Sequence, residues 1–500
     1  MKKTALLLAL FLSATVLRAQ KVYKPDHADL DTRPLPAWFG QAKFGIFIHW
    51  GPYSVPAWSP KGTYEEWYQY WLQTEGIFGN GDFSGKEIPD MQSKLYGESS
   101  SYYDFGRQFK AELYDPAQWA KLFKKAGAKY VILTSKHHDG FTLWPNKEAG
   151  NARNFKWNSV DIGAKRDLVG DYMKAMRSEG LKAGLYFSLL EWYHPWSRQG
   201  MFDKFVDRHI HPQFKDLVTR YSPDLIYADG EWGHSAKEWK SEELLAWLYN
   251  ESSAKDHVIV NDRWGRGDRH KHGGYYTTEY EVHGVKGDHP WEEIRGMGLS
   301  FGYNRMEDLE DYNSSKTLIL MLADIVSRGG NLCLNIGPRA DGKIPVIMQE
   351  RLTQIGAWLS VNGEAIYGTK KWSTPIQWSK GSRDFDFKAG GKKYIEGDYI
   401  LKQTVDPIPG KAVKEVFFTS KGDALYAIIP KWRKGKVTLK NVTVAQGAKV
   451  TLLGADKKAK FRQSGKNLVI DMPDFDPEWN LPPEAYVIKI SKVRRQKNTI

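Results

Sequence analysis

The stretch Phe44-Gly-Ile-Phe-Ile-His-Trp-Gly51 begins the pattern that decides the fold. Five residues suited to a buried strand lead directly into a histidine and a tryptophan, so an apolar segment ends in polar side chains. The same arrangement recurs at Tyr130–Ser135, which leads into Lys136-His-His-Asp-Gly140, and at Leu225–Asp229. The pattern predicts parallel strands whose carboxyl ends carry the chemistry.

Eight such segments alternate with amphipathic helices from residue 43 to about residue 368. The expected strands are Phe44–Trp50, Tyr130–Ser135, Ala183–Leu189, Leu225–Asp229, Val258–Asp262, Tyr275–Tyr280, Leu299–Tyr303 and Leu332–Ile336. Apolar residues repeating about every 3.6 positions predict helices at Pro116–Ala126, Asp167–Glu179, Phe202–Tyr221, Ser241–Ser252, Lys316–Ser327 and Val346–Val361. Together they predict an α/β catalytic domain with a (β/α)8-like TIM barrel, covering residues 20–368.

The helical pattern stops after about Gly368, and short alternating runs take over. These runs are Ala424–Ile429, Val437–Leu439, Val450–Leu453, Leu468–Ile470 and Tyr486–Ile490. They predict a C-terminal antiparallel β-sandwich domain over residues 369–500. The polar, Gly- and Ser-rich stretch Asn80–Ser101 predicts a long mobile loop over the mouth of the barrel.

The first nineteen residues have the features of a secretory signal peptide. Lys2 and Lys3 precede an apolar run from Ala5 to Leu17, and a small residue, Ala19, follows. This run is shorter than the roughly 20 residues that span a bilayer. We therefore expect export to the periplasm or the extracellular space, with no membrane span.

Composition excludes some other classes of protein. The formal net charge is +13, but the basic residues are scattered and no nucleic-acid-binding motif accompanies them, so no nucleic-acid partner is expected. Cys333 is the single cysteine, which forbids an internal disulfide, and its apolar surroundings predict a buried, inert thiol. These features leave the oligomeric state open.

Two acidic residues stand at predicted strand ends, where a pair of carboxyl groups could cleave a glycosidic bond. Asp229 ends the fourth strand and Glu279 lies at the end of the sixth. One carboxylate can attack or activate water while the other protonates the leaving oxygen. The alternative is that these residues cap helices or form ion pairs.

Three histidine pairs also invite a metal site: His137 with His138, His209 with His211, and His270 with His272. Neighbouring residues of a strand point to opposite faces, so the first pair cannot chelate one ion without a bend. Recognition of hydroxyl groups by neutral imidazoles is favoured over a metal, and buried hydrogen-bonded histidines are the third possibility. We expect neither a metal nor an organic cofactor.

Several longer motifs occur in order over roughly residues 30–370. They are residues 44–51, Glu66-Trp-Tyr68, Ala128-Lys-Tyr-Val131, Thr134-Ser-Lys-His-His-Asp-Gly-Phe141, Trp157-Asn-Ser-Val-Asp161, Asp167-Leu-Val169, Gly298-Leu-Ser-Phe-Gly-Tyr-Asn304, Gly329-Gly-Asn-Leu332 and Asn335-Ile-Gly-Pro338. In this combination the chain resembles the α-L-fucosidases of glycoside hydrolase family 29. The resemblance implies an exo-acting, retaining enzyme on such a barrel, without cofactor, that acts on a fucosylated oligosaccharide or glycoconjugate.

The resemblance also implies roles for individual residues. Asp229 matches the family's nucleophile, although Tyr227 stands where a tryptophan is usual. Glu279 matches the acid/base, with Glu292 as the alternative because that position shifts between branches of the family. The implied sugar-binding residues are His49, Trp58, Glu66, Trp67, His137, His138, Tyr186, Tyr227 and Arg263.

Two other functions remain open from the sequence. One is a non-catalytic fucose-binding protein on a degenerate barrel, against which the presence of both Asp229 and Glu279 argues. The other is a related exo-galactosidase, whose pocket would accept a hydroxymethyl group where fucose has a methyl group.

Overall fold

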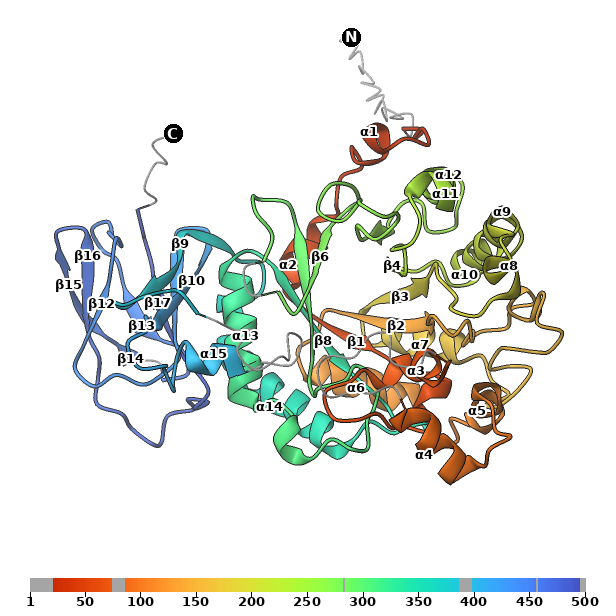
Figure 1. The fold of residues 1–500 in the computed structure, drawn as a ribbon. Coiled ribbons are helices and arrows are strands. Elements are labelled where there is room, and N and C mark those ends of the chain that lie inside the picture. The colour runs from red at the N-terminus through yellow and green to blue at the C-terminus, as the bar shows by residue number, and fades with distance from the viewer. Residues whose placement is uncertain (1–20, 74–85, 282–283, 386–397, 456, 495–500) are drawn as a thin grey trace, which may run out of the picture.

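The computed structural model describes residues 21–73, 86–281, 284–385, 398–455 and 457–494 (Figure 1). The expected signal peptide at residues 1–19 lies outside this part of the chain, as does the beginning of the stretch Asn80–Ser101. The rest of that stretch contains α4 (Glu87–Tyr96) and the start of α5 (Tyr102–Gln108) follows it. The expectation of a loop was therefore wrong for residues 87–96.

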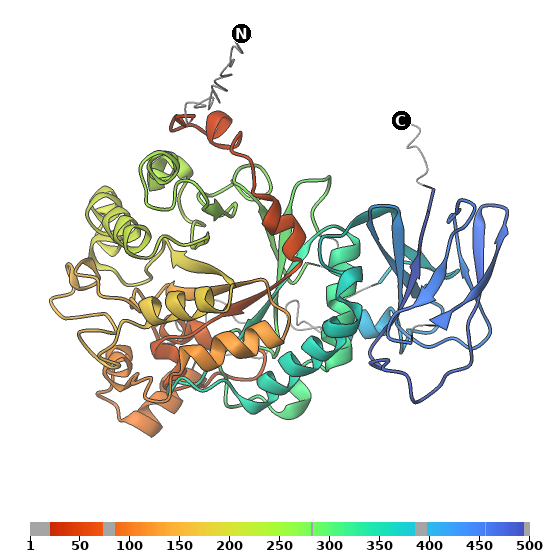
Figure 2. The ribbon, with the colours of Figure 1, turned by 180° about the vertical axis from the view of Figure 1, so that it is seen from behind.

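A sheet of eight parallel strands forms the larger part of the molecule (Figures 1 and 2). Its strands are β1 (Phe44–Ile48), β2 (Tyr130–Lys136), β3 (Lys182–Ser188), β4 (Leu225–Asp229), β5 (Ile259–Val260), β6 (Tyr276–Glu279), β7 (Trp291–Gly296) and β8 (Asn331–Ile336). Their order is β5-β4-β3-β2-β1-β8-β7-β6; among the described residues β5 and β6 form no strand ladder, but the Tyr275 backbone N–H, directly before β6, donates to the Val260 carbonyl of β5 at 3.2 Å. The sheet is thus a curled, barrel-like one that is open at a single seam, and the predicted α/β class is confirmed.

The seventh strand is not where the sequence placed it. Leu299–Tyr303 is a loop, and the strand is Trp291–Gly296, which carries three charged side chains. These side chains can be buried because they have polar partners: Arg295 Nε lies 2.6 Å from Glu293 Oε1, and the carboxyl group of Glu292 accepts a hydrogen bond from Tyr130. The partners that allow these side chains to be buried are recognisable only in the folded structure. The sequence of this strand therefore shows no apolar run.

Helices cover the outside of the curled sheet. The longer ones are α6 (Pro116–Lys125), α7 (Leu168–Ser178), α10 (His211–Tyr221), α12 (Ser241–Asn250), α13 (Ser315–Ser327) and α14 (Val346–Asn362), close to the predicted ranges. Asp115 caps α6 by accepting hydrogen bonds from the backbone of Ala117 and Gln118. The shorter helices are α1 (His27–Leu30), α2 (Ala37–Ala42), α3 (Tyr68–Gln73), α8 (Pro195–Arg198), α9 (Phe202–Phe205), α11 (Ala236–Trp239) and α15 (Asp398–Lys402), and a π-helical turn at Val206–Ile210 joins α9 to α10.

The interior of the curled sheet is filled with side chains and is not a channel. Phe39 and Ala42 of α2 pack against Tyr130, Ile132 and other inward-facing strand residues. Tyr130 and Ile132 point inward from β2, whereas Val131 and Leu133 face the outer helices. The packed interior leaves the carboxyl ends of the strands as the place for a site.

Antiparallel strands form the C-terminal part of the chain (blue in Figures 1 and 2). One sheet has the order β14-β13-β17-β11-β10-β9 and the other the order β12-β16-β15. The strands are β9 (Lys370–Trp378), β10 (Lys414–Lys421), β11 (Ala424–Ile429), β12 (Lys436–Leu439), β13 (Val450–Leu452), β14 (Lys457–Lys458), β15 (Lys460–Ser464), β16 (Asn467–Asp471) and β17 (Tyr486–Ile490). Lys414 of β10 reaches Asp324 of α13 at 2.8 Å, so a buried ion pair joins this part to the barrel helices.

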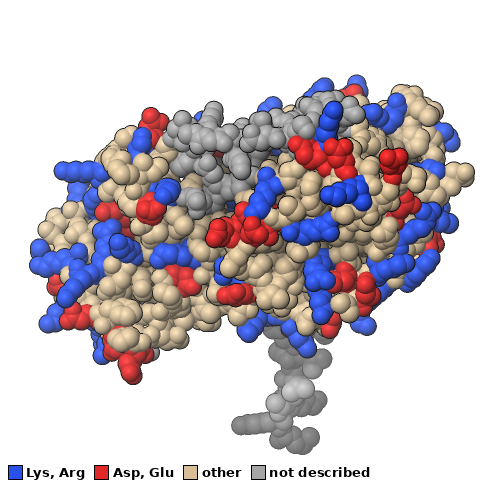
Figure 3. Space-filling model, turned by 60° about the horizontal axis from the view of Figure 1, so that its bottom comes forward, with Lys and Arg blue, Asp and Glu red and all other residues tan. Residues whose placement is uncertain are grey.

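Charged side chains are mixed on the molecular surface. Figure 3 shows Lys and Arg spread over one face with Asp and Glu among them. Within the described ranges, no helix is both long enough and apolar enough to cross a membrane.

Candidate active site

A cavity of about 130 Å³ opens at the carboxyl ends of the barrel strands. It is smaller than the pockets of about 300–1,000 Å³ that hold drug-sized ligands, so it fits a single sugar ring. Its lining residues come from strand ends and the loops that follow them: Phe47, His49, Tyr64, Glu66, Trp67, His137, His138, Tyr186, Tyr227, Asp229, Trp232, Arg263, Arg269, Glu279, Ile294 and Phe301.

Asp229 is the last residue of β4 and the most strongly stabilised anion of the cavity. Arg263 Nη1 donates to Asp229 Oδ1 at 2.9 Å, and the Tyr186 hydroxyl donates to Asp229 Oδ2 at 3.0 Å. Burial by itself would raise the pKa of Asp229, but the positive charges of Arg263 and Arg269 lower it well below its usual range. Asp229 is therefore an ionised carboxylate, as a nucleophile must be.

Glu279, at the end of β6, is the second carboxylate of the cavity. Arg263 Nη2 lies 3.3 Å from Glu279 Oε2, so the same guanidinium contacts both carboxylates. A single planar guanidinium can bridge two carboxylates only when they are close together, as are the pairs about 5–5.5 Å apart in retaining glycosidases. The Glu279 side chain is 29% exposed, so it can reach solvent as well as a ligand.

The backbone turns sharply directly after Glu279. Tyr280 has φ 53°, in the left-handed region that bulky residues rarely adopt. Its ring stacks on Phe301 at 5.6 Å, and its hydroxyl accepts a hydrogen bond from the Gly296 backbone at 3.1 Å. These contacts hold the unusual conformation and fix the direction in which Glu279 leaves the strand.

Two neutral imidazoles present acceptor nitrogens to the cavity. Asn335 Nδ2 donates to the Phe301 carbonyl, so its Oδ1 accepts from His49 Nδ1 at 2.5 Å. Likewise Ser188 Oγ donates to the Leu190 carbonyl and accepts from His138 Nδ1 at 2.6 Å. With Nδ1 protonated, each Nε2 carries a lone pair that can accept a hydrogen bond from a hydroxyl group.

Burial keeps both imidazoles uncharged. It lowers the pKa of His49 to about 4 and that of His138 to about 4. His137 lies beside them, with its ring stacked on Tyr186 at a centroid distance of 5.7 Å. The three histidines therefore act as hydrogen-bonding groups at neutral and mildly acidic pH.

The 3-10 helical turn Glu65–Trp67, which follows β1 in the chain, contributes another part of the lining. Glu66 Oε2 accepts hydrogen bonds from Ser300 Oγ at 3.0 Å and from the Gly302 backbone at 2.9 Å. Burial raises the pKa of Glu66 to about 7. Trp67 stacks on Trp232 at 5.7 Å, which extends an aromatic surface from the cavity to the outside.

The structure brings together all but one of the sugar-binding residues expected from the sequence. Trp58 is partly buried against the core and does not appear among the described lining residues. Six further residues line the cavity and are not among those predicted from the sequence: Phe47, Tyr64, Trp232, Arg269, Ile294 and Phe301. The sequence could have indicated Trp232 as a site residue, because it closely follows the end of a strand. Arg269 lies in the long segment between β5 and β6, and no sequence pattern indicates that it reaches the cavity.

Glu292 lies away from the cavity. It pairs in register with Thr277, two residues before Glu279, and its side chain is fully buried against Tyr130 near the other end of the barrel. Burial raises the pKa of Glu292 to about 8. This position favours Glu279 over Glu292 as the partner of Asp229.

The buried Glu292 carboxyl is expected to make the protein less stable as the pH rises. From its ordinary value of 4.5 up to about 8, the unfolded chain releases a proton that the folded chain retains. The free energy of unfolding then falls by about 1.4 kcal/mol per pH unit from this group. Glu292→Gln keeps the shape and the acceptor without the titration, so its Tm should fall less between pH 5 and pH 8 in calorimetry. Equal decreases in Tm for both proteins would contradict this role.

Comparison with known proteins identifies the same family as the sequence motifs do, and the matches extend over most of the chain. A family model described as alpha-L-fucosidase matches residues 10–364, and one described as alpha-L-fucosidase C-terminal domain matches residues 410–491. The tissue alpha-L-fucosidase of Homo sapiens is 41% identical over 504 residues, covering 98% of this chain and 97% of that protein. The alpha-L-fucosidase of Dictyostelium discoideum is 42% identical over 378 residues, covering 74% and 79%.

Solved structures agree with the sequence comparison. The crystal structure of Thermotoga maritima alpha-fucosidase in complex with a mechanism based inhibitor has a TM-score of 0.74 to this chain at 35% identity. It covers 94% of this chain and 100% of its own.

Proposed function

The chain belongs to the α-L-fucosidase family, and we propose that Asp229 and Glu279 carry out its hydrolysis of terminal α-L-fucosides by a retaining double displacement. The resemblance seen in the sequence is thus confirmed for the family and its activity. The observation that carries the assignment of the two residues is the Arg263 guanidinium, which holds both carboxylates in one sugar-sized cavity.

In the first step Asp229 attacks the anomeric carbon of fucose while Glu279 donates its proton to the glycosidic oxygen. The bond from the anomeric carbon to that oxygen breaks, and a fucosyl ester of Asp229 forms. In the second step Glu279 takes a proton from water, whose oxygen attacks the anomeric carbon and displaces Asp229. Two inversions leave L-fucose with its original anomeric configuration.

The remaining cavity side chains suit a 6-deoxy sugar. His49, His138 and Glu66 offer acceptors for vicinal hydroxyl groups. Phe47, Ile294 and Phe301 form apolar parts of the lining, against which a methyl group loses no hydrogen bond. A hydroxymethyl group would lose one there, which supports fucose over galactose as the substrate.

The reaction is tested by the initial rate of aryl alcohol release from an aryl α-L-fucoside, with α- and β-galactosides alongside. Selective turnover of the fucoside is expected, and NMR of the first product should show the α anomer. Fucose binding without turnover would instead support a non-catalytic sugar-binding protein, and preferred turnover of a galactoside would support an exo-galactosidase.

Arg263→Lys is expected to reduce kcat/KM for the fucoside by about 10²–10³-fold, because a single ammonium cannot hold both carboxylates as the planar fork does. The variant also loses the hydrogen bond from Arg263 Nε to Thr277 Oγ1. Arg266→Lys is the matched control, because Arg266 is an exposed residue three positions along the chain. A loss below about fivefold for Arg263→Lys would contradict the bridging role.

We also propose that the protein is exported to the periplasm or the extracellular space. The basic start and the apolar run of residues 1–19 support this proposal. Cleavage after Ala19 predicts Gln20 as the first residue of the exported protein, which N-terminal sequencing can check. A protein retained in the cytoplasm with Met1 intact would contradict it.

A further inference from the structure

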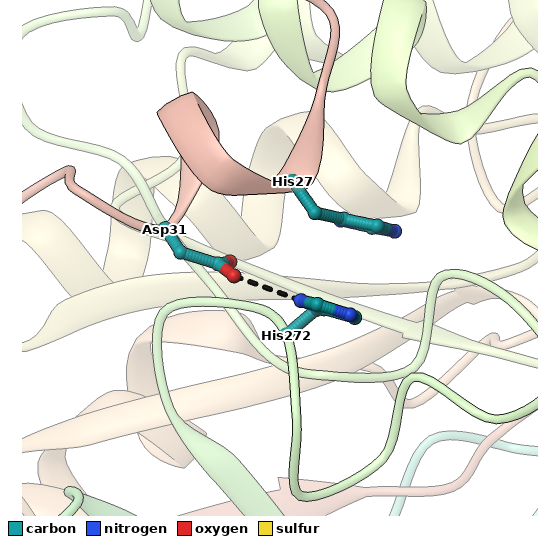
Figure 4. A group of neighbouring side chains, drawn as sticks. All are labelled: His27, Asp31 and His272. Carbon is teal, nitrogen blue, oxygen red and sulfur yellow. Dashed lines mark hydrogen bonds and ion pairs between the residues drawn. The ribbon is translucent and has the colours of Figure 1, made fainter.

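Among the described residues, two groups of side chains outside the cavity combine the residue types that bind metal ions. The first group, His27, Asp31 and His272, joins α1 to the segment between β5 and β6 (Figure 4). Its two imidazoles lie in parallel planes, 5° apart at a centroid distance of 4.0 Å, so their in-plane lone pairs do not converge on one ion. Asp31 already accepts a hydrogen bond from His272 Nδ1 at 2.8 Å. This group therefore ties two segments together and does not form a metal site.

The second group, Glu191, His194 and His209, is buried, and its carboxylate already has two cationic partners. Glu191 Oε1 lies 2.9 Å from Lys136 Nζ, and Glu191 Oε2 contacts Arg153 Nη2. Two buried positive charges beside one carboxylate would repel a metal ion. The group therefore needs another explanation, and its position next to the sugar-binding histidines supplies one.

Glu191, in the loop after β3, holds the last residue of β2. Lys136 ends that strand, and His137 and His138, which line the cavity, follow it directly. The side chains of Lys136 and Glu191 are completely enclosed, and Lys136 also donates to Gln213 of the outer helix α10 at 3.1 Å. The ion pair thus anchors the strand end on the side of the helices, behind the histidines that face the sugar.

The end of β2 contains a bulge directly before the two histidines. Thr134 pairs with Tyr186 of β3, but Lys136 pairs with the next residue, Phe187. Ser135 is therefore an extra residue, and its hydroxyl donates to the Tyr186 carbonyl at 2.6 Å. Side chains alternate between the two faces of a regular strand, whereas a bulge changes the direction of the residues at and after it. A bend of this kind needs contacts that hold it in one conformation.

The loop after β3 holds the turn Lys136–Gly140 at two further points. The Trp192 backbone N–H donates to the His138 carbonyl at 2.9 Å. Gly140 has φ 76°, and a Cβ atom at this position would lie only 2.5 Å from Glu191 Oε2. The turn that carries both histidines therefore packs directly on the Glu191 carboxylate, with no room for a side chain between them.

A π-helical turn at Val206–Ile210 directs a third partner to Glu191. His209, in this turn, places its Nε2 2.7 Å from Glu191 Oε1, and because an ionised carboxylate only accepts, Nε2 carries the proton. Burial by itself would raise the pKa of Glu191, but the positive charges of Lys136 and Arg153 hold it well below its usual range. Single π-helical turns within helices occur frequently at functional sites.

We propose that Glu191 is a positioning residue that fixes the turn Lys136–Gly140, so that His137 and His138 face the hydroxyl groups of fucose. Glu191 does not appear among the described residues that line the cavity, so it acts through Lys136 and the turn. This inference rests on the proposed hydrolysis of fucosides in that cavity. Because a misplacement of about 1 Å can reduce a rate by about 100-fold, loss of the anchor should reduce turnover although Glu191 touches no substrate.

Glu191→Gln keeps the shape of the side chain and removes its charge, and kcat/KM for an aryl α-L-fucoside should fall by about 10–10²-fold. The decisive readout is the preference for this fucoside over its 2-, 3- and 4-deoxy analogues, as a ratio of kcat/KM values. His138→Ala identifies the analogue that lacks the hydroxyl group bound by His138. Glu191→Gln should lower the preference over that same analogue by at least about fivefold. The intrinsic reactivity of each analogue cancels when a variant is compared with the unaltered protein.

Asp324→Asn is the matched control. Asp324 is also a buried carboxylate between two cations, with Lys414 Nζ at 2.8 Å and Arg328 Nη2 at 2.7 Å, but it lies at the junction of α13 with the C-terminal sheets. Both substitutions leave buried cations without their partner, so both should lower the Tm. Asp324→Asn should nevertheless leave the preference over every deoxy analogue within about twofold, because lower stability alone affects all substrates equally.

Lys136→Met provides the same test if circular dichroism shows that Glu191→Gln does not fold. It leaves Glu191 paired with Arg153, so no buried charge loses its only partner, but it removes the anchor of β2. The same loss of preference is expected. An unchanged preference in the folded variants, with equal losses for all four substrates, would overturn the proposal.

Failure of the proposed function would show differently, as absence of turnover by the unaltered protein. The comparison is then made with the Kd values of L-fucose and its deoxy analogues, measured by isothermal titration. A selective loss of affinity for L-fucose in Glu191→Gln or Lys136→Met, but not in Asp324→Asn, would support the positioning role, and equal affinities in all these proteins would overturn it.

Discussion

Replacement of Asp229 by glycine is expected to reduce kcat on an aryl α-L-fucoside by at least about 10⁴-fold, because without the nucleophile no fucosyl ester can form. Arg263, Tyr186 and His138 would remain in the cavity, so the sugar can still bind. The loss should therefore fall mainly on kcat, with a much smaller change in the affinity for fucose.

Added azide tests whether the lost group is the nucleophile. In Asp229→Gly, azide can occupy the space of the carboxylate and attack the anomeric carbon once, which gives a β-L-fucosyl azide of inverted configuration. Asp224→Asn is the matched control: it precedes β4 at the far end of the strand and pairs with Lys182 at 2.7 Å. Activity of Asp229→Gly within about tenfold of the unaltered enzyme would exclude Asp229 as the nucleophile.

Replacement of Glu279 by glutamine is expected to have an effect that depends on the leaving group. General acid catalysis contributes about 10²–10⁴-fold, so hydrolysis of a fucosylated disaccharide should fall by that factor. The first step with a dinitrophenyl fucoside needs no protonation of its leaving group, so the burst of dinitrophenol should be much less affected. Azide should again increase turnover, here with retained configuration, because Asp229 remains in place.

Two neighbouring glutamates serve as controls for Glu279. Glu281 is exposed two residues along the chain, and Glu292 is buried against Tyr130 away from the cavity. Glu281→Gln and Glu292→Gln should both retain turnover within about threefold. A loss in Glu292→Gln that depends on the leaving group would instead assign the acid/base to Glu292.

Most barrel strands could be located in the sequence, because a strand that is buried on both faces has a sequence made of a short run of apolar residues. Leu225–Asp229 was predicted with the bounds that β4 has in the structure. The seventh strand was missed because Glu292, Glu293 and Arg295 look solvent-exposed in the sequence. Their burial depends on partners such as Tyr130, which is far away in the chain, and no local pattern reveals such pairing.

The site residues that stand at strand ends could be predicted from the sequence. His49, His137, His138 and Asp229 follow or end strands and meet in one cavity. Trp232 and Arg269 come from loops, whose paths no periodicity determines. The preference for Glu279 over Glu292 depends on the register between β6 and β7. In this register Thr277 pairs with Glu292, and Glu279 pairs with Ile294.

The most direct test of the central claim is to trap the intermediate. Asp229 should displace fluoride from a 2-deoxy-2-fluoro-L-fucosyl fluoride and form an ester that is slow to hydrolyse, because the 2-fluorine destabilises the positively charged transition state. Peptide mass spectrometry should then find one sugar per chain on the peptide that contains Asp229, with loss of activity in proportion. A label on any other residue, or continued turnover with no covalent label, would contradict a retaining mechanism through Asp229.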